Sequence, residues 1–572
     1  MPEYLSPGVY IEEVDRGPKP IEGVGTAMPV FVGFSEKAQL IEQVDGETIT
    51  TDVLGRPQLV TNWTQYVERF GNFIEGAYMP HAIYGYFMNG GNRCYVLSVK
   101  TIPKAQAALL GGDGRPQLMV QAKQAGFDGL RLRVKIEAPE QPGAVLPPPP
   151  AAPSRKGDKG EKKEEAEQGG ETPPPAEPPP PVPSPVAAAG APRFFNLIVE
   201  RQSVTGAWQE KEKLSEVTLT EVQTVSGPEV RVAYRNNKAS QFIDLLVPDV
   251  KAPLAKLWPK TQEQTLKIES NLLAPATYTD FQGDVVERTG VEGLEALDDV
   301  TMVCVPDLMT PMPGQQLDLD IVKAVQTLII GHCERMGDRV AILDSPPHMN
   351  PQQIKKWRMD TAGFDSSYAA LYYPWIQVMD PVKNAPVLVP PGGHMAGIWA
   401  RSDNTRGVHK APANEVVRGA TGLAYNVTKG EQDTLNPNGV NCIRAFPGLG
   451  IRVWGARTLA SNPSWRYLNV RRLFNYVEKS IERGTQWVVF EPNDPFLWMR
   501  IKRDVAAFLG TVWGQGALFG FTPDQAFYVK CDEELNPPAI RDLGQLIIEI
   551  GMCPVKPAEF VIFRISQWAG PG

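Results

Sequence analysis

A stretch crowded with glycine and proline near the middle of the chain restricts its fold more than any other feature. Residues 390–415 read PPGGHMAGIWARSDNTRGVHKAPANE. The glycines permit backbone angles that a Cβ atom would forbid, and the prolines fix φ and remove hydrogen-bond donors. The stretch also carries the large apolar side chains of Met395, Ile398 and Trp399. We therefore expect neither a helix nor a strand here, but a closely packed connection.

Length and composition indicate a large globular protein. The chain has 572 residues, enough for about three or four domains. Its 42% hydrophobic and 9% aromatic residues suffice for sizeable cores. A net charge of -8 argues against a general nucleic-acid binder. Six cysteines without CxxC or metal-ligand spacing are typical of buried free thiols in a reducing compartment.

The first residues, MPEYLSPGVYIEEV, have neither the basic region nor the apolar core of a signal peptide. No apolar run in the sequence is long enough for a bilayer. We expect a soluble protein made in the cytoplasm.

Continuous apolar runs that alternate with helical segments predict an α/β domain with a buried, mostly parallel sheet. We expect strands at residues 27–34, 93–99, 300–305, 339–343 and 369–373. We expect helices at residues 63–70, 81–88, 321–335 and 352–361, the first with Thr61 or Asn62 as its N-cap.

Residues 103–270 have a different pattern of apolar and polar residues, and they interrupt the alternation of strands and helices. Short β-type runs separated by polar turns predict a small β-sandwich inserted in the α/β domain. Within the insertion, residues 139–192 are rich in Pro, Ala, Glu, Lys and Gly, and we expect a disordered, solvated loop. A Pro-rich recognition tract is the alternative for this loop.

Residues 441–557 predict a last domain of the α+β type. One helix is expected at 468–483, and a second begins after the cap Asp494 and ends before Gly510. Strands are expected at 526–531 and 546–552, as a hairpin. The apolar residues of that hairpin that we expect to accept a further strand are Phe527, Val529, Ile547, Ile548 and Ile550.

Both ends of the sequence contain a strand-like run that has no partner nearby. The apolar residues are Val9, Tyr10, Ile11 and Val14 near the start, and Phe560, Val561, Ile562, Phe563 and Ile565 near the end. Such runs can add to a sheet edge of another subunit by main-chain hydrogen bonds, with flexible hinges at 16–20 and 553–557. A swap limited to a closed dimer is the alternative, whereas head-to-tail contacts propagate into helices.

A serine hydrolase is one hypothesis for the function of the chain, and the sequence gives this hypothesis little support. Asp344, His348 or His394, and Ser366 or Ser402 could be arranged as a triad. However, no GxSxG motif occurs, and His394 sits among apolar residues, as a satisfied packing histidine does. No HExxH motif or cluster of His and Cys indicates a metal site.

Several motifs together resemble the phage tail sheath family, whose members wrap the tube of a contractile tail or injection machine. The central resemblance lies in PPGGHMAGIWAR, DNTRGV and HKAPANE. Further motifs follow the family's order: PGVYIEEV, AIYGYFMNGGNRCYVLSVK, VEGLEALDDVTMVCVPD, RVAILDSP and SSYAALYYPWIQVMDP. The resemblance covers almost all of the chain outside 103–270.

The resemblance implies a sheath subunit with a subtilisin-like α/β domain, no enzymatic activity and no cofactor. It implies hexameric rings stacked helically around an inner tube, with baseplate and terminal cap proteins as partners, no nucleic acid, and no direct membrane insertion. Assembly is expected in the cytoplasm, within a tail-like particle that stays there or is released. The expected divisions are a donated arm 1–20, sheath-domain parts 21–102 and 271–440, the outer insertion 103–270, a tube-facing domain 441–557 and a second arm 558–572.

The tube contact is expected on one face of the 468–483 helix. Arg472, Lys479 and Arg483 form a basic stripe there, complementary to an acidic tube exterior. A merely solvated helix face is the alternative. A single full-length chain argues against a type VI secretion sheath, which is split into two proteins, and leaves phage tail, R-type pyocin and extracellular-type injection system open.

Overall fold

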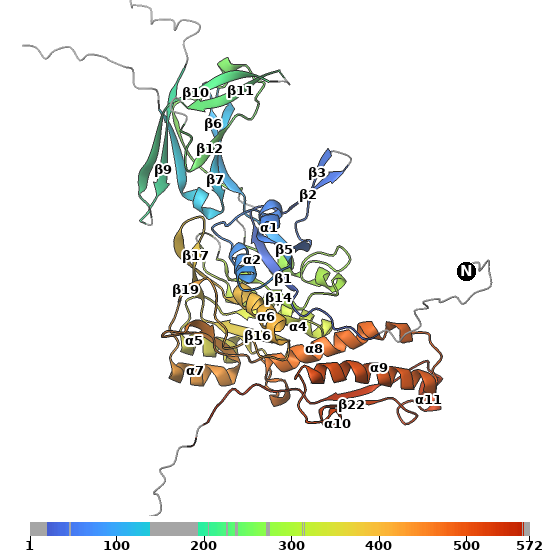
Figure 1. Cartoon of the computed structure of the whole chain (residues 1–572). Coiled ribbons are helices and arrows are strands. Elements are labelled where there is room, and N and C mark those ends of the chain that lie inside the picture. The colour runs from blue at the N-terminus through green and yellow to red at the C-terminus, as the bar shows by residue number, and fades with distance from the viewer. Residues whose placement is uncertain are drawn as a thin grey trace, which may run out of the picture. The chain divides into compact units, whose positions relative to one another are not determined.

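The computed structural model describes residues 20–44, 47–137, 193–203, 205–224, 227–234, 238–269, 275–311, 313, 315–562 and 564. They form two compact units (Figure 1). The first spans Met1–Lys104, Gln124–Asp128 and Ile268–Gly572, and the second spans Ala105–Lys123 and Gly129–Lys267. The residues predicted as the N-terminal arm, Val9, Tyr10, Ile11 and Val14, lie outside the described part of the chain, as does the loop 139–192.

An eight-stranded sheet is the centre of the first unit. In spatial order its strands are β21 (Gly450–Val453), β20 (Val440–Phe446), β16 (Ala369–Tyr373), β15 (Val340–Asp344), β14 (Met302–Cys304), β1 (Pro29–Ser35), β5 (Cys94–Thr101) and β4 (Gln58–Val60). The inner strands pair in parallel, and the edge strands β21 and β4 pair antiparallel. The α/β class and the predicted strands are thus confirmed.

Helices cover both faces of this sheet because its strands are apolar on both sides. Phe31 of β1 meets Tyr86 of α2 (Met79–Met88) with ring centroids 5.6 Å apart. Phe34 points to the opposite face and meets Phe281 of α3 (Tyr278–Gln282) at 6.3 Å. The helix α6 (Gly392–Arg406) packs beside α2, and α4 (Leu319–Met336) packs beside α3.

Three more predicted helices of the first unit are confirmed. The helix α1 (Trp63–Phe70) has Asn62 as N-cap, whose side chain accepts from the Gln65 N–H, and Gly71 ends it. The helix α5 (Pro351–Lys356) continues into a π-helical turn, Trp357–Ala362. The helix α8 (Leu468–Gly484) lies in the last domain. A helix not predicted, α7, spans Lys429–Leu435.

The expectation that residues 390–415 form a connection is wrong for most of the stretch, because α6 occupies it. A Cβ atom on Gly393 would lie 2.3 Å from the Cα of Ala82, and one on Gly397 would lie 2.6 Å from the carbonyl oxygen of Tyr86. The glycines therefore allow the backbones of α6 and α2 to approach, rather than form turns. Met395, Ile398 and Trp399 are fully buried.

The described part of the first unit has three smaller sheets, of which the hairpin in the last domain is given below. One has the order β18 (Ala385–Val389), β17 (Ile376–Asp380), β19 (Ala420–Leu423). A second is the hairpin of β2 (Gln39–Val44) and β3 (Glu47–Asp52).

In the last domain, α8 shares a core with α9 (Pro495–Gly514), Ala526 of α10 (Pro523–Ala526) and the hairpin of β22 (Phe527–Lys530) and β23 (Glu549–Met552). The short helix α11 (Pro538–Arg541) lies between the two strands in the sequence. Asp494 caps α9 as predicted, but the helix continues beyond Gly510. Nothing lies within 4 Å of a Cβ placed there, and the positive φ of 79° belongs to Gly516. Gly510 is thus an ordinary helical position, and the stop comes later.

The second unit consists of β-structure. A five-stranded sheet has the order β11 (Gly227–Tyr234), β10 (Trp208–Thr224), β9 (Phe195–Gln202), β8 (Leu132–Glu137), β13 (Gln262–Thr265). A three-stranded sheet has the order β12 (Ile243–Leu246), β7 (Pro116–Ala125), β6 (Lys104–Leu110). In the five-stranded sheet, Arg133 and Lys135 pair with Glu200 and Glu263 on neighbouring strands.

Candidate functional site

The start of α6 is held by a buried carboxylate at the end of β15. Asp344 Oδ1 accepts a hydrogen bond from the Gly392 N–H at 2.7 Å. Burial raises the pKa of Asp344 to about 7, although this hydrogen bond opposes the shift. The neighbouring helix α2 starts in the same manner, because buried Asp307 accepts from the N–H groups of Tyr78 and Met79.

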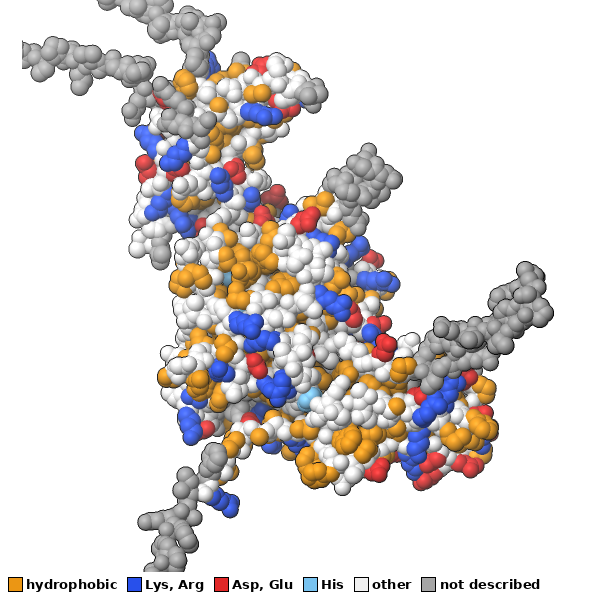
Figure 2. Space-filling model, viewed as in Figure 1, with side chains coloured by type: hydrophobic (Ala, Val, Ile, Leu, Met, Phe, Trp, Pro, Cys, Tyr) orange, Lys and Arg blue, Asp and Glu red, His pale blue; other side chains and the backbone are white. Residues whose placement is uncertain are grey.

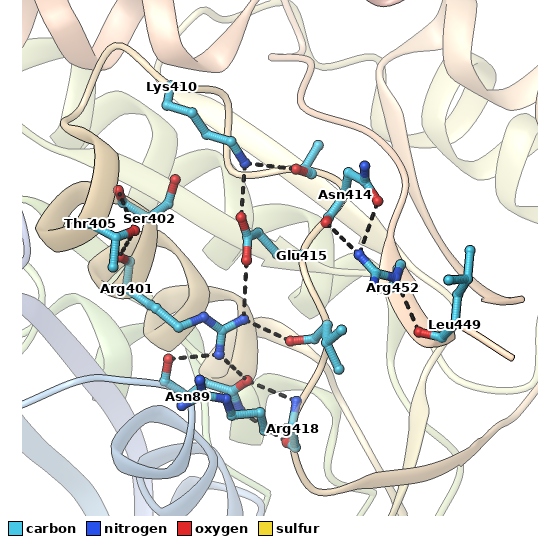
Figure 3. Close-up of polar contacts among 12 residues, drawn as sticks. Asn89, Arg401, Ser402, Thr405, Lys410, Asn414, Glu415, Arg418, Leu449 and Arg452 are labelled. Carbon is cyan, nitrogen blue, oxygen red and sulfur yellow. Dashed lines mark hydrogen bonds and ion pairs between the residues drawn. The ribbon is translucent and has the colours of Figure 1, made fainter.

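The end of α6 and the loop that follows it are fixed by a polar network (Figure 3). Asn89, at the C-cap of α2, donates to the Arg418 carbonyl at 3.0 Å and accepts from the Arg418 N–H at 3.0 Å. Arg401 of α6 donates to the Asn89 carbonyl at 3.1 Å and to the Val416 carbonyl at 2.7 Å. The side chains of Asn89 and Arg401 therefore join α2, α6 and the 407–418 loop.

The same loop is attached to the edge strand β21. Glu415 pairs with Lys410 at 2.9 Å and with Arg401 at 3.6 Å. Arg452 of β21 donates to the carbonyl oxygen of Asn414 at 2.9 Å (Figure 3). The motif residues in HKAPANE thus hold a loop in place, and their polar groups are used within the chain.

A buried ion pair joins α6 to the last domain. Arg472 of α8 contacts Asp403 of α6 at 2.9 and 2.5 Å, and their side chains are 4% and 3% exposed. Asp403 also accepts from Thr26 Oγ1 at 2.6 Å, and Arg472 donates to the Thr26 carbonyl at 3.1 Å. The guanidinium lies 4.8 Å from the ring centroid of Trp399. The segment around Thr26, the helix α6 and the helix α8 are distant in the sequence, and they meet at this ion pair.

The predicted basic stripe on α8 is therefore wrong as an exposed surface. Arg472 is buried, and Lys479 is only 15% exposed and pairs with Asp338 at 3.4 Å. Arg483 is exposed but donates to the carbonyl oxygen of Asp298 at 2.9 Å. Helical spacing placed the three residues on one face correctly, but that face packs against Asp403 of α6, Asp338 and Asp298. A cavity of about 230 Å³ lies along it.

The predicted strand-accepting hairpin forms with a shorter second strand. Phe527, Val529 and Ile550 lie in β22 and β23, whereas Ile547 and Ile548 precede β23. Buried Asn536 accepts from the Ile547 N–H at 2.7 Å and donates to its carbonyl at 2.9 Å. The Asn536 side chain thus forms hydrogen bonds with the N–H and carbonyl groups of Ile547, which would pair with the other strand if β23 were longer.

The segment predicted as the second hinge is held by hydrogen bonds. The Cys553 carbonyl accepts from the Phe519 N–H at 2.7 Å, and the Val555 N–H donates to the Ala517 carbonyl at 3.1 Å. Cys553 is exposed, so the prediction of buried thiols is confirmed only for the other five cysteines. Beyond this segment Phe560, Val561 and Ile562 are 70%, 69% and 80% exposed. Phe563 and Ile565 lie outside the described residues.

Among the residues of the serine-hydrolase triad, Asp344 and Ser366 have other hydrogen-bond partners, whereas His394 Nδ1 and Ser402 Oγ have none among the described residues. Asp344 binds the start of α6, as described above. His394 Nδ1 and Ser402 Oγ are buried without a hydrogen bond, so His394 is not the satisfied histidine that we expected. Burial lowers the pKa of His394 to about 3. Ser366 Oγ accepts from the Tyr368 N–H at 3.1 Å.

Within the described ranges, no three or more His, Cys, Asp or Glu side chains lie together in a way suited to a metal ion. Over the same ranges, no helix combines the length and the apolar character needed to cross a membrane.

The sequence analysis did not single out most of the side chains that join distant segments of the first unit. Asn89, Asp403, Arg457 and Glu559 each bind a residue remote in the chain. For Asp403 and Asn89 the family motifs were the available signal, since both lie in quoted stretches.

Comparison with known proteins agrees with this architecture. A family model described as the phage tail sheath protein central domain matches residues 288–459, and one described as the phage tail sheath C-terminal domain matches residues 460–567. The boundary between them falls just before α8, where the Arg472–Asp403 pair joins the two parts.

Two sequence relatives are sheath proteins. The tail sheath protein of Vibrio phage KVP40 is 25% identical over 268 residues, which cover 43% of this chain and 39% of the phage protein. A putative prophage major tail sheath protein of Pseudomonas aeruginosa strain UCBPP-PA14 is 27% identical over 289 residues, covering 49% of this chain and 70% of that protein. The chain thus matches well under half the length of the KVP40 protein.

A solved structure extends the similarity of fold to nearly the whole chain. The sheath complex of the extracellular contractile injection system PVC in its contracted state has a TM-score of 0.54 and 20% identity, covering 99% of both chains. Residues 288–567 thus match the two phage tail sheath domains, and nearly the whole chain shares the fold of this solved sheath protein.

Proposed function

We propose that the chain is the structural sheath subunit of a contractile, tail-like injection machine. Subunits would polymerise as stacked hexameric rings around an inner tube, and contraction would drive the tube through a target envelope. The two domain matches and the fold support this proposal. No chemical step is required of the chain, because the energy would be stored in contacts between subunits.

An exposed apolar run and a two-stranded hairpin, both in the last part of the described chain, carry the proposal. Phe560, Val561 and Ile562 are exposed and lie in no strand, whereas β22 and β23 form a sheet to which the described residues add no third strand. A run of this kind can add to such an edge on another subunit. With about five main-chain bonds at ~0.5–1.5 kcal/mol each, one such arm would contribute roughly 3–8 kcal/mol.

A second arm would be formed by residues 1–20 and would pair through Val9, Tyr10, Ile11 and Val14. Two strand additions per subunit would link the lattice in two directions, so that bodies could turn while the links persist. Head-to-tail contacts of this kind propagate into a helical assembly rather than close a dimer.

The surface of the last domain supports contacts with further partners. Large apolar side chains are exposed there, among them Phe490, Phe496, Phe519, Phe521 and Leu543, and orange side chains are frequent over this domain in Figure 2. Exposed apolar surface of this extent marks protein-binding sites. We propose other sheath subunits and the inner tube as the proteins that cover it, with baseplate and terminal cap proteins at the ends of the sheath, and assembly in the cytoplasm.

Electron microscopy of the purified chain tests the proposal. Negative staining should show long tubes of uniform width, since each subunit carries both an arm and an edge that accepts one. Deleting residues 560–572 should leave folded, soluble protomers without tubes. Discrete particles from the intact chain, at any concentration and salt, would overturn the proposed function.

A further inference from the structure

Glu559 makes the last side-chain contact before the exposed run at the end of the described chain. Its Oε1 accepts from Arg457 Nε at 2.9 Å and from Asn436 Nδ2 at 2.7 Å. Its Oε2 accepts from Arg457 Nη2 at 2.6 Å and from Tyr467 Oη at 3.1 Å. Both carboxylate oxygens are thus used twice, in a bidentate arginine pair with two further donors.

The partner arginine is itself fixed to the central sheet. The Arg457 N–H donates to Asn441 Oδ1 at 2.7 Å, and Asn441 Nδ2 donates to the Arg457 carbonyl at 2.8 Å. Asn441 lies in β20 and is fully buried. The Arg457 and Glu559 side chains are 9% and 19% exposed. Burial raises the pKa of Glu559, but the hydrogen bonds from Arg457, Asn436 and Tyr467 outweigh it and lower the pKa overall.

The chain is hydrogen-bonded to the last domain before Glu559 and is exposed after it. Before it, the backbone of Cys553 and Val555 is bonded to Ala517 and Phe519 of the last domain. After it, Phe560 to Ile562 are largely exposed. Glu559 therefore returns the chain from the last domain to the central sheet at the residue after which the exposed run begins.

We infer that Glu559 is a positioning residue for the C-terminal arm: its clamp on Arg457 sets the point from which the arm leaves the body and couples the arm to the central sheet. This inference rests on the proposed function. Because the side chains of a strand alternate between two faces, the face that Phe560 and Ile562 present to a neighbouring hairpin depends on where the strand starts. A fixed starting point therefore selects one register, and a pull on the arm is passed to β20 rather than to the hairpin of the same subunit.

The test compares two changes to the full-length chain. Glu559→Gln keeps the shape of the side chain and removes its charge. The second variant keeps Glu559 and inserts one glycine between Glu559 and Phe560, beyond the last contact of the clamp, which reverses the faces of the residues that follow. Glu229→Gln is the matched control, since Glu229 pairs with the exposed Arg231 in the second unit, outside the arm and the hairpin.

Polymerisation and thermal melting are measured for each variant. The insertion should leave the melting temperature of the protomer unchanged and raise the critical concentration for tube formation about tenfold or more, a change that corresponds to ~1.4 kcal/mol of subunit contact. Glu559→Gln should do the same and should also speed amide hydrogen exchange in residues 553–562. Glu229→Gln should change neither property.

Tubes that form from the insertion variant at the wild-type concentration and with the wild-type helical repeat would overturn the inference. The clamp would then only stabilise the domain. If Glu559→Gln fails to fold, the insertion variant decides alone. Failure of the wild-type chain to form tubes would instead count against the proposed function, so the two failures are distinguishable.

Discussion

At the scale of single residues, the first unit depends on buried charges that are each matched within the chain. Arg472 and Asp403 are both nearly inaccessible to solvent. Removing one partner of such a pair leaves the other charge buried and unpaired, which is worse than removing both. Asp344 is matched differently, by one N–H group at a helix start, and its pKa is raised to about 7 as a result of burial.

Arg472→Met is expected to destabilise the first unit by about 3–5 kcal/mol, because Asp403 loses its counter-charge in a buried place. Thermal or urea unfolding of the soluble protomer measures the loss. Arg503→Met is the control: Arg503 is 59% exposed and pairs with the adjacent Asp504, so a change within ~0.5 kcal/mol is expected. Equal effects of the two variants would contradict a structural role for the buried pair.

The pH dependence of stability is expected to reflect Asp344. Its folded pKa of about 7 lies above the unfolded value of about 3.9. The folded state therefore binds more protons between these values, and stability falls as pH rises from about 4 to 7. Asp344→Asn keeps an acceptor for the Gly392 N–H but does not titrate, so it should reduce this fall by on the order of a few kcal/mol.

Urea unfolding at several pH values between 4.5 and 8 measures that slope. Burial raises the pKa of Asp307 to about 7 as well, so the Asp344→Asn variant should keep the part of the slope that Asp307 contributes. Asp433→Asn, at an exposed position of α7, should retain the wild-type slope. A slope unchanged by Asp344→Asn would show that the carboxylate is ionised in the folded state throughout this range.

At the scale of elements, the pairing of α2 with α6 explains the glycine-rich motif. Two glycines of α6 bring its backbone against α2, and a third, Gly85 of α2, leaves room for the His394 ring, whose Cε1 would lie 2.3 Å from a Cβ there. Close packing of two helices on one sheet face positions Asn89 and Arg401 at their ends, where the 407–418 loop is fixed.

Gly393→Ala should destabilise the first unit by at least ~1–3 kcal/mol, because the added methyl group meets the backbone of Ala82 rather than a movable side chain. Gly430→Ala is the matched control within α7, where nothing lies within 4 Å, and it should be neutral or stabilising by up to ~1 kcal/mol. Melting temperatures distinguish them. A neutral Gly393→Ala variant would mean that the two helices can move apart freely.

At the scale of the whole molecule, the first and last residues of the second unit lie close together. Gln106 and Lys267 form an antiparallel bridge, with N–H to carbonyl distances of 2.9 Å in both directions. Residues bonded in this way have Cα atoms about 5.5 Å apart, so a linker of a few residues spans the gap. Residues 124–128 belong to the first unit but lie between residues 105 and 267 in the sequence. Removing residues 105–267 therefore also removes Phe127, which packs at Gly76 of the first unit.

Replacing residues 105–267 with a short Gly-Ser linker should therefore leave the first unit folded, with a lowered melting temperature from the loss of Phe127. Circular dichroism checks the fold, and negative staining checks for tubes, which should still form if residues outside the first unit are not needed for assembly. An insoluble or unfolded product would show that the first unit depends on the second.

Much of the architecture was determined by the sequence alone, because it follows from local patterns. Apolar runs such as those of β15 and β16 are buried on both faces wherever a parallel sheet forms, and the Asn62 and Asp494 caps act on backbone groups three residues away. The tertiary structure alone decided the rest. It made a helix of the 392–406 glycines by placing α2 against them, it buried Arg472 by supplying Asp403 69 positions away, and it held Glu559 by supplying Arg457 at a separation of 102. A charged or glycine-rich segment takes its conformation from the partner that it meets, and no local pattern names that partner.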